Sequence, residues 1–273
     1  MSSYLLPIFY TLFVWWFSTG VILYLNGLPR WTYRWTMSAT TLLLALALLG
    51  LYATRNDTRV TGAYLSFTCA VMVWAWQEVA FLLGFVTGPR RTPCPPGALR
   101  WRRAGFALQT LLHHEAALIV LGVAVVGLTW NGSNPTGLFT FAILWVMRQS
   151  AKLNVFLGVR NLNEEFLPSH LKYLQTYFTR KPMNSLFPVS IAVSTWLAVQ
   201  VWQGAVADGV SAFDATALTF AGTLLSLAIL EHWFLVLPLP SEALWSWGLR
   251  SREAGAVTGV GNRAPAQAST KRL

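Results

Sequence analysis

The stretch GFALQTLLHHEAALIVLGVAVVGL, residues 105–128, is apolar almost throughout but carries His113, His114 and Glu115 near its middle. A run of about 20 apolar residues is long enough to cross the hydrocarbon core of a bilayer as a helix. A charged side chain at the centre of a bilayer costs about 2.5–3.5 kcal/mol on insertion scales. The three polar side chains therefore predict a compensating partner, which is another side chain, a metal or a cofactor.

The rest of the chain has the same membrane character. Of its 273 residues, 55% are hydrophobic and only 11% are charged, whereas a soluble domain has about 25% charged residues. We predict an all-α polytopic bundle of about seven transmembrane helices over residues 1–250, followed by a disordered cytoplasmic tail over residues 251–273. The predicted spans are residues 4–25, 35–53, 62–86, 105–130, 136–159, 186–207 and 215–239.

Basic residues predict the orientation of the bundle. The net charge is +10, but most Lys and Arg residues lie in short loops, where they set topology and indicate no nucleic-acid partner. With seven spans and a periplasmic N-terminus, the periplasmic loops hold only Arg55 and Arg59 as basic residues. Nearly all other basic residues then fall on the cytoplasmic side, which predicts a cytoplasmic C-terminus. The expected surroundings of the spans are membrane lipid.

Acidic and imidazole side chains of three predicted spans fall at one depth. At a rise of 1.5 Å per residue, Glu78, His113 and Glu231 each lie about 12 Å from the cytoplasmic boundary. Arg148 and Lys152 of the fifth span are four residues apart and share a helix face at the same level. We therefore predict a working layer with further polar residues beneath it. Its candidate residues are Glu78, His113, His114, Glu115, Glu231 and His232, with Glu164, Glu165 and His170 below.

Three interpretations of this layer stay open. In the first, all nine residues are candidate ligands of iron or another divalent metal, because His and Glu bind such metals and bundle-core di-iron sites combine them. No Glu-x-x-His pair occurs, however, and adjacent residues such as Glu231 and His232 diverge by about 100° on a helix. In the second, the glutamates pair with Arg148 and Lys152, and the histidines form hydrogen bonds within the bundle.

In the third interpretation, a histidine binds the metal of a (bacterio)chlorophyll-type tetrapyrrole. The candidates for this cofactor are His113, His114 and His232. The 14 Trp and 16 Phe residues of the chain would suit a flat macrocycle, although aromatic residues at span ends are more often interfacial.

Four segments of the chain are similar to those of a known family: WWFSTG at 15–20, HHE at 113–115, NVFLGVRNLNEEFLP at 154–168 and LEH at 230–232. With them the chain resembles the PuhE family, photosynthetic complex assembly proteins of purple phototrophic bacteria. The resemblance implies a multi-pass protein of the bacterial inner membrane, cytoplasmic or intracytoplasmic, that assists assembly of the reaction centre and light-harvesting complexes. It also implies a role in modulating bacteriochlorophyll supply.

The resemblance further implies reaction-centre or light-harvesting subunits and pigment-synthesis enzymes as partners, and it assigns no catalytic residue. The alternative function is a membrane metal-dependent oxidase or hydroxylase, of di-iron type, acting on a tetrapyrrole or another lipophilic substrate. A transporter is a weaker alternative, because transporters usually show broken helices in related halves and no internal repeat is evident here.

Overall fold

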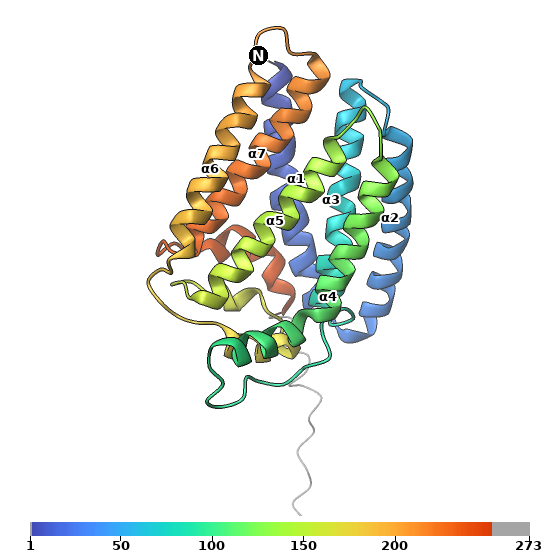
Figure 1. Ribbon diagram of the computed structural model, residues 1–273. Coiled ribbons are helices and arrows are strands. Elements are labelled where there is room, and N and C mark those ends of the chain that lie inside the picture. The colour runs from blue at the N-terminus through green and yellow to red at the C-terminus, as the bar shows by residue number, and fades with distance from the viewer. Residues whose placement is uncertain (1, 253–273) are drawn as a thin grey trace, which may run out of the picture.

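The computed structural model describes residues 2–252, and in this part of the chain the fold is entirely helical (Figure 1). The long helices are α1 (Ser2–Gly27), α2 (Tyr33–Thr54), α3 (Val60–Leu82), α4 (Arg100–Thr129), α5 (Thr136–Leu157), α6 (Leu186–Ala205) and α7 (Ala212–Phe234). The short 3-10 helices are η1 (Arg30–Thr32), η2 (Glu164–Phe166), η3 (Ser169–Tyr177) and η4 (Ser241–Trp245). The predicted all-α class is confirmed. Residues 253–273 of the predicted tail lie outside the described residues.

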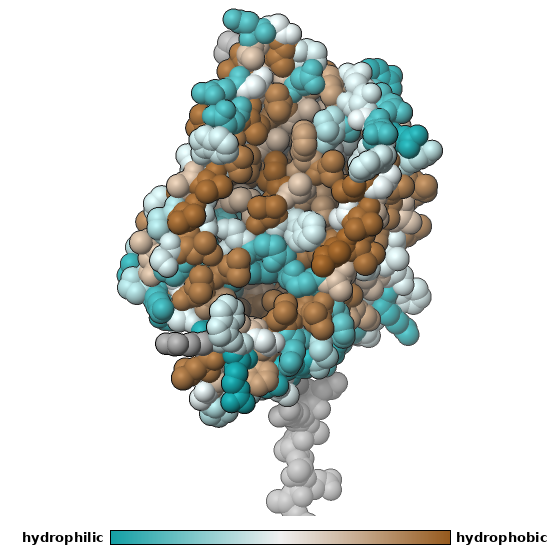
Figure 2. All heavy atoms as spheres, in the orientation of Figure 1, coloured by the Kyte–Doolittle hydropathy of each residue, from teal (hydrophilic) through white to brown (hydrophobic). Residues whose placement is uncertain are grey.

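Six of the long helices are long and apolar enough to cross a membrane. α5 is not among the six, because Arg148, Gln149 and Lys152 lower its hydropathy. It nevertheless packs within the bundle, against α3, α4 and α7, and runs diagonally across the front of the view in Figure 1. On the face shown in Figure 2, hydrophobic residues gather over the middle and hydrophilic residues are more frequent toward the two ends, as expected for a multi-pass membrane protein. Near the middle of that face, hydrophilic residues interrupt the apolar band.

α3 ends earlier than the predicted span, which reached residue 86. The helix stops at Leu82 because Gly84 adopts a left-handed conformation with a φ of 83°. The amides of Phe85 and Val86 then bond back to the carbonyl of Ala80, at 2.9 and 3.1 Å. A glycine in this conformation is a common end of a helix, because it satisfies the last carbonyl groups.

α4 is bent where the chain after α3 runs beside it. The Thr87 carbonyl accepts a hydrogen bond of 2.9 Å from the His114 amide, and the Arg90 amide donates to the Gln109 carbonyl at 3.3 Å. In Figure 1 the first turns of α4 lie across the lower end of the bundle, and the helix then rises beside α3 and α2. α4 therefore begins at Arg100, five residues before the predicted fourth span, and ends within one residue of it.

α3 and α7 form the most buried part of the bundle. The Phe67 ring of α3 stacks on the Phe220 ring of α7, with ring centroids 4.3 Å apart. Tyr64 and Tyr10 pack edge-on against the same Phe220 ring, at 4.8 and 6.1 Å. This aromatic cluster joins α1, α3 and α7.

Candidate functional site

A cavity of about 410 Å³ lies between α1, α3, α5 and α7. On each helix the lining positions recur every three or four residues, as Trp15, Ser18 and Ile22 do on α1, so a single face of each helix lines the cavity. Phe67 of the aromatic cluster lines it as well, and Leu174 of η3 belongs to the segment that closes the other end. The wall is mostly apolar, with a few charged side chains among the apolar ones.

Arg148 and Lys152 of α5 form ion pairs with the neighbouring helices. The Arg148 guanidinium lies 3.0 Å from Glu78 Oε2 on α3, and the Lys152 ammonium lies 2.7 Å from Glu115 Oε1 on α4. Gln149 Nε2 donates a hydrogen bond of 2.6 Å to the other oxygen of Glu115. The two cations share a face because they are four residues apart. Two of the three predicted glutamates are thus neutralised by α5, which is the arrangement of the second interpretation.

Glu231 of α7 has a different environment. Its Oε1 accepts a hydrogen bond of 2.7 Å from the indole nitrogen of Trp15 on α1. Among the described residues it takes part in no salt bridge. Its side chain lines the same cavity as Glu78 and Arg148. Glu231 is therefore an acidic group that the cavity presents without a directly paired cation.

The histidines do not join this group. His113 is exposed on the outer face of α4, whereas His114 is buried with its ring centroid 4.6 Å from that of Phe81. His232 Nδ1 donates to the Ala228 carbonyl at 2.8 Å, so its Nε2 accepts from the Ser150 hydroxyl at 2.9 Å. Within residues 2–252, which include all four histidines, no histidine lines the cavity. The structure thus brings the three predicted glutamates of the layer to one region and leaves the imidazoles around it.

The family of the chain is shown by its sequence. Residues 1–256 match the family described as "Protein of unknown function (DUF3623)". The chain belongs to this family. It is 43% identical over 254 residues to a protein of Rhodobacter capsulatus named "Uncharacterized 30.4 kDa protein in puhA 5'region", a match that covers 91% of this chain and 92% of that protein. No solved structure matches the chain.

In this DUF3623 chain, the residues predicted below the layer lie apart from the cavity wall. Glu164 forms a salt bridge with Arg180 at 3.1 Å. The Glu165 backbone carbonyl accepts a hydrogen bond from Arg252, and His170 lines a separate pocket. Within residues 2–252, no three His, Cys, Asp or Glu side chains gather as they would around a metal ion. The metal interpretation therefore stays a prediction without a gathered set of ligands.

His232 instead belongs to a polar network on the opposite face of α5. The Ser150 hydroxyl that bonds to His232 lies 3.1 Å from the Ser190 hydroxyl of α6. Asn154 Nδ2 also donates to Ser190, at 3.1 Å. Asn184 Nδ2 donates to the Asn154 carbonyl at 3.1 Å. These bonds tie α5, α6 and α7 together and indicate a structural role for His232.

Sequence reasoning missed Trp15 as a partner of the site, and it missed the cavity itself. In the sequence, Trp15 stands out only as part of an aromatic segment in the first span. A signal was present, because α1 places Thr11, Ser18 and Thr19 on the same face as Trp15, and a polar face on a membrane helix is unusual. The cavity has no comparable local signal, since it depends on how far apart α1 and α5 lie.

Proposed function

We propose that the protein is a membrane-embedded assembly factor of the photosynthetic apparatus, which holds a lipophilic pigment or pigment precursor in the cavity between α1, α3, α5 and α7. The observation that carries this proposal is the cavity wall, which is mostly apolar but presents the carboxylate of Glu231 without a paired cation. Small-molecule sites are typically apolar pockets with a few placed polar groups that orient the ligand.

The photosynthetic assignment is supported by the relative in Rhodobacter capsulatus, whose name places it in the puhA 5' region, part of a photosynthesis gene cluster. The resemblance to the PuhE family points to the same process. On this proposal the partners are reaction-centre or light-harvesting subunits and the enzymes that make the pigment.

The side chains of the cavity wall limit the types of contact that could hold a tetrapyrrole. No histidine lines the cavity, so its wall offers no imidazole as an axial ligand. Trp15 and Phe156 offer flat apolar surfaces, and Arg148 and Glu231 offer hydrogen bonds to polar substituents. The residues present fit a lipophilic ring with a polar edge and do not fit a histidine-bound metal. No observation favours the alternative of a di-iron-type oxidase.

We also propose that α5 is the seventh crossing, with a periplasmic N-terminus and a cytoplasmic C-terminus in the bacterial inner membrane. Ser251 donates a hydrogen bond of 2.9 Å to the Tyr24 carbonyl, near the end of α1. The chain therefore starts and finishes its described part at opposite ends of α1, which favours an odd number of crossings. The pairing of Arg148 and Lys152 with Glu78 and Glu115 makes a crossing by α5 energetically acceptable.

The test is pigment retention by the full chain purified in mild detergent from a phototrophic host. Ala151 lines the cavity on α5, so Ala151→Phe should fill part of it and reduce the pigment absorbance per protein several-fold. Ala116 is exposed on α4 and is absent from the cavity wall, so Ala116→Phe is a matched control that should retain pigment. Colourless wild-type protein from pigment-rich membranes, or equal retention by both variants, would overturn the proposal.

A further inference from the structure

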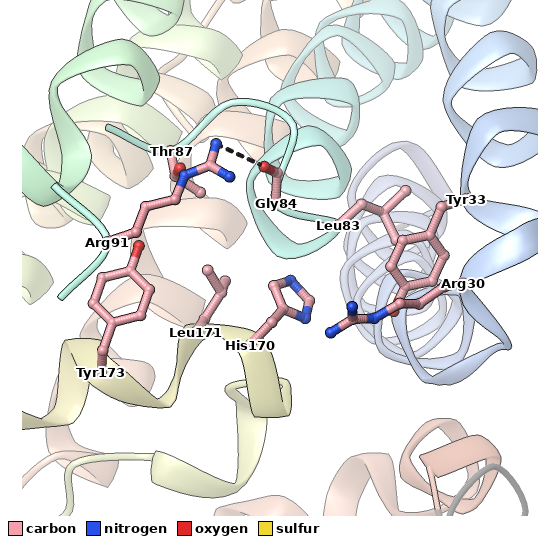
Figure 3. A pocket seen from close by; sticks show the side chains of 9 residues that line it. All are labelled: Arg30, Tyr33, Leu83, Gly84, Thr87, Arg91, His170, Leu171 and Tyr173. Carbon is pink, nitrogen blue, oxygen red and sulfur yellow. Dashed lines mark hydrogen bonds between the residues drawn. The ribbon is translucent and has the colours of Figure 1, made fainter. Parts of the chain in front are cut away.

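A second pocket, of about 370 Å³, lies outside the cavity. Three segments far apart in the chain form it: Arg30 of η1 with Tyr33 at the start of α2, residues 83–91 after α3, and residues 170–173 of η3 (Figure 3). All three belong to connections at the lower end of the bundle in Figure 1. This is the end that the basic loops assign to the cytoplasm.

The described lining of the pocket is positively charged. Within residues 2–252, Arg30 and Arg91 line it and no Asp or Glu does. Arg91 donates one hydrogen bond into this region, to the Gly84 carbonyl at 3.3 Å. Neither arginine forms a salt bridge within the described residues. Figure 3 shows the two side chains on opposite sides of the His170 ring, so both guanidinium groups border the same pocket.

The imidazole of His170 adds an unused polar atom. Its Nε2 is buried and makes no hydrogen bond within the described residues. The ring lies close to the backbone at Gly84, where an added Cβ would be 3.2 Å from Nε2. Buried polar atoms normally have a partner, and one without a partner inside a pocket indicates a place for a ligand or water. Glycine at position 84 keeps this side of the pocket open.

We propose that this pocket binds the phosphate group of an anionic ligand at the cytoplasmic surface, through the guanidinium groups of Arg30 and Arg91 and the hydroxyl of Tyr173, with Nε2 of His170 donating when the imidazole is protonated. The planar guanidinium matches the oxygens of a phosphate, and such charge-assisted bonds are the stronger ones in proteins. The alternative is that the two arginines only set the topology of the protein. That role needs basic residues in a loop, but it does not explain why they line a pocket that also contains an unpaired imidazole nitrogen.

Two sources share this chemistry, namely the headgroup of an anionic phospholipid and a small soluble phosphorylated compound. The experiment uses the full chain, and thermal unfolding is its readout. One arm adds inorganic phosphate to the protein in detergent. The other compares nanodiscs of phosphatidylcholine with nanodiscs that contain phosphatidylglycerol. A ligand that binds only the folded protein raises the unfolding temperature, and the stabilisation grows with the logarithm of the ligand concentration above its Kd.

The variants Arg30→Gln and Arg91→Gln should each weaken the apparent affinity about tenfold, the size expected for one lost charge-assisted hydrogen bond. Arg34→Gln is the matched control. Arg34 is exposed on the same helix as Tyr33 and lies over the Trp35 ring, outside the pocket. Tyr173→Phe removes only an oxygen atom and tests the pocket should an arginine variant fail to fold.

Stabilisation by phosphate in detergent assigns the pocket to a soluble phosphorylated compound. Stabilisation by phosphatidylglycerol alone assigns it to a lipid headgroup. The absence of both effects in the wild-type protein overturns the proposal, and so does an equal loss of affinity in Arg34→Gln. The result is independent of pigment retention, because Ala151→Phe changes the cavity and leaves this pocket intact.

Discussion

The Lys152 ammonium lies 2.7 Å from Glu115 Oε1, and the two side chains keep only 21% and 20% of their area exposed. In low-dielectric surroundings a close ion pair behaves as one neutral unit. Removal of one member leaves the other charge without its counter-charge and with little access to water, and this costs more than the pair itself contributes.

Glu115→Gln should therefore lower the free energy of unfolding by about 3 kcal/mol, at the lower end of the range for a buried pair because some exposure remains. Lys152→Met should have a similar effect, and the double variant should be less destabilised than the two single effects added together. Thermal unfolding in detergent measures all three. Glu164→Gln, at the more exposed pair with Arg180, is the control and should change stability little. Strict additivity would mean that the pair is not coupled.

Two variants separate the contribution of the Trp15–Glu231 contact to stability from its contribution to pigment binding. Trp15→Phe removes the indole donor and should lower the free energy of unfolding by about 1 kcal/mol, the net contribution of a typical hydrogen bond, because Glu231 is exposed. Glu231→Gln keeps an oxygen that accepts from Trp15, so stability should hold while pigment retention falls. Trp196→Phe, on the exposed face of α6, should change neither quantity. Unchanged retention in Glu231→Gln would remove Glu231 from the site.

Asn184 should matter for the attachment of α6 and not for the cavity. Its Oδ1 accepts from the amides of Leu186 and Phe187 at 2.8 and 3.2 Å, at the start of α6. Asn184→Ala should lower the free energy of unfolding by about 2 kcal/mol, since a cap and buried hydrogen bonds are lost together. Pigment retention should stay at the wild-type level. Gln203→Ala, exposed on the same helix, is the control. A large loss of pigment would show that this network supports the cavity.

Phosphate binding in the second pocket should strengthen as the pH falls from about 7.5 to about 5.5. Burial, followed by the charge of Arg30, holds the pKa of His170 below its ordinary value, although the Leu82 carbonyl acts in the opposite direction. The imidazole is therefore neutral near pH 7, and it adds a positive charge when the pH falls through its pKa. The remaining ionisable groups around it are Arg91, Arg252, Tyr33 and Tyr173, which do not titrate in this range.

The measurement is the affinity for phosphate across this pH range, in the wild type and in His170→Gln. Titration of phosphate itself affects both proteins equally, so the difference between them gives the contribution of the imidazole. Only the wild type should gain affinity beyond that common change. The same shift implies that the wild type without ligand loses stability as the pH falls below about 6.5, since the unfolded chain then binds the additional proton. Parallel curves for both proteins would exclude protonation of His170 on binding.

The number of crossings can be tested with thiol labelling by a membrane-impermeant reagent. Cys94 precedes α4 and should be labelled only from the cytoplasmic side. In a Cys94→Ser background, Ser133→Cys, between α4 and α5, should be labelled only from the periplasmic side. Met183→Cys, after α5, decides the question: labelling on the cytoplasmic side supports a crossing by α5. Labelling of Met183→Cys and Ser133→Cys from the same side would contradict it.

The positions of the helices were largely accessible from the sequence, because an apolar run of membrane length is itself the signal. The ends of the helices were less predictable. The early end of α3 depends on the conformation of Gly84, and the bend of α4 depends on a neighbouring segment. The side-chain contacts of the site were harder to predict than the helix ends. Pairing of Glu78 with Arg148 was one of several open alternatives, because sequence gives the depth of a residue in a span but not the rotation of the helix.

The two elements of the site that sequence reasoning missed are both long-range. Trp15 and Glu231 are 216 positions apart in the chain, and no periodicity connects them. The cavity arises where α1 and α5 stay apart while each packs against α7. Such a gap follows from the shapes of many side chains together, so no short motif encodes it.

The ion pairs of α5 have a consequence for biogenesis on the proposed seven-span topology. α5 leaves the ribosome after α3 and α4, so Glu78 and Glu115 have already entered the translocon region when Arg148 and Lys152 arrive. Each cation would otherwise add about 2.5–3.5 kcal/mol to the cost of membrane insertion. The order of helices along the chain thus supplies the counter-charges before the helix that requires them, and α5 synthesised without the two earlier helices should be left outside the bilayer.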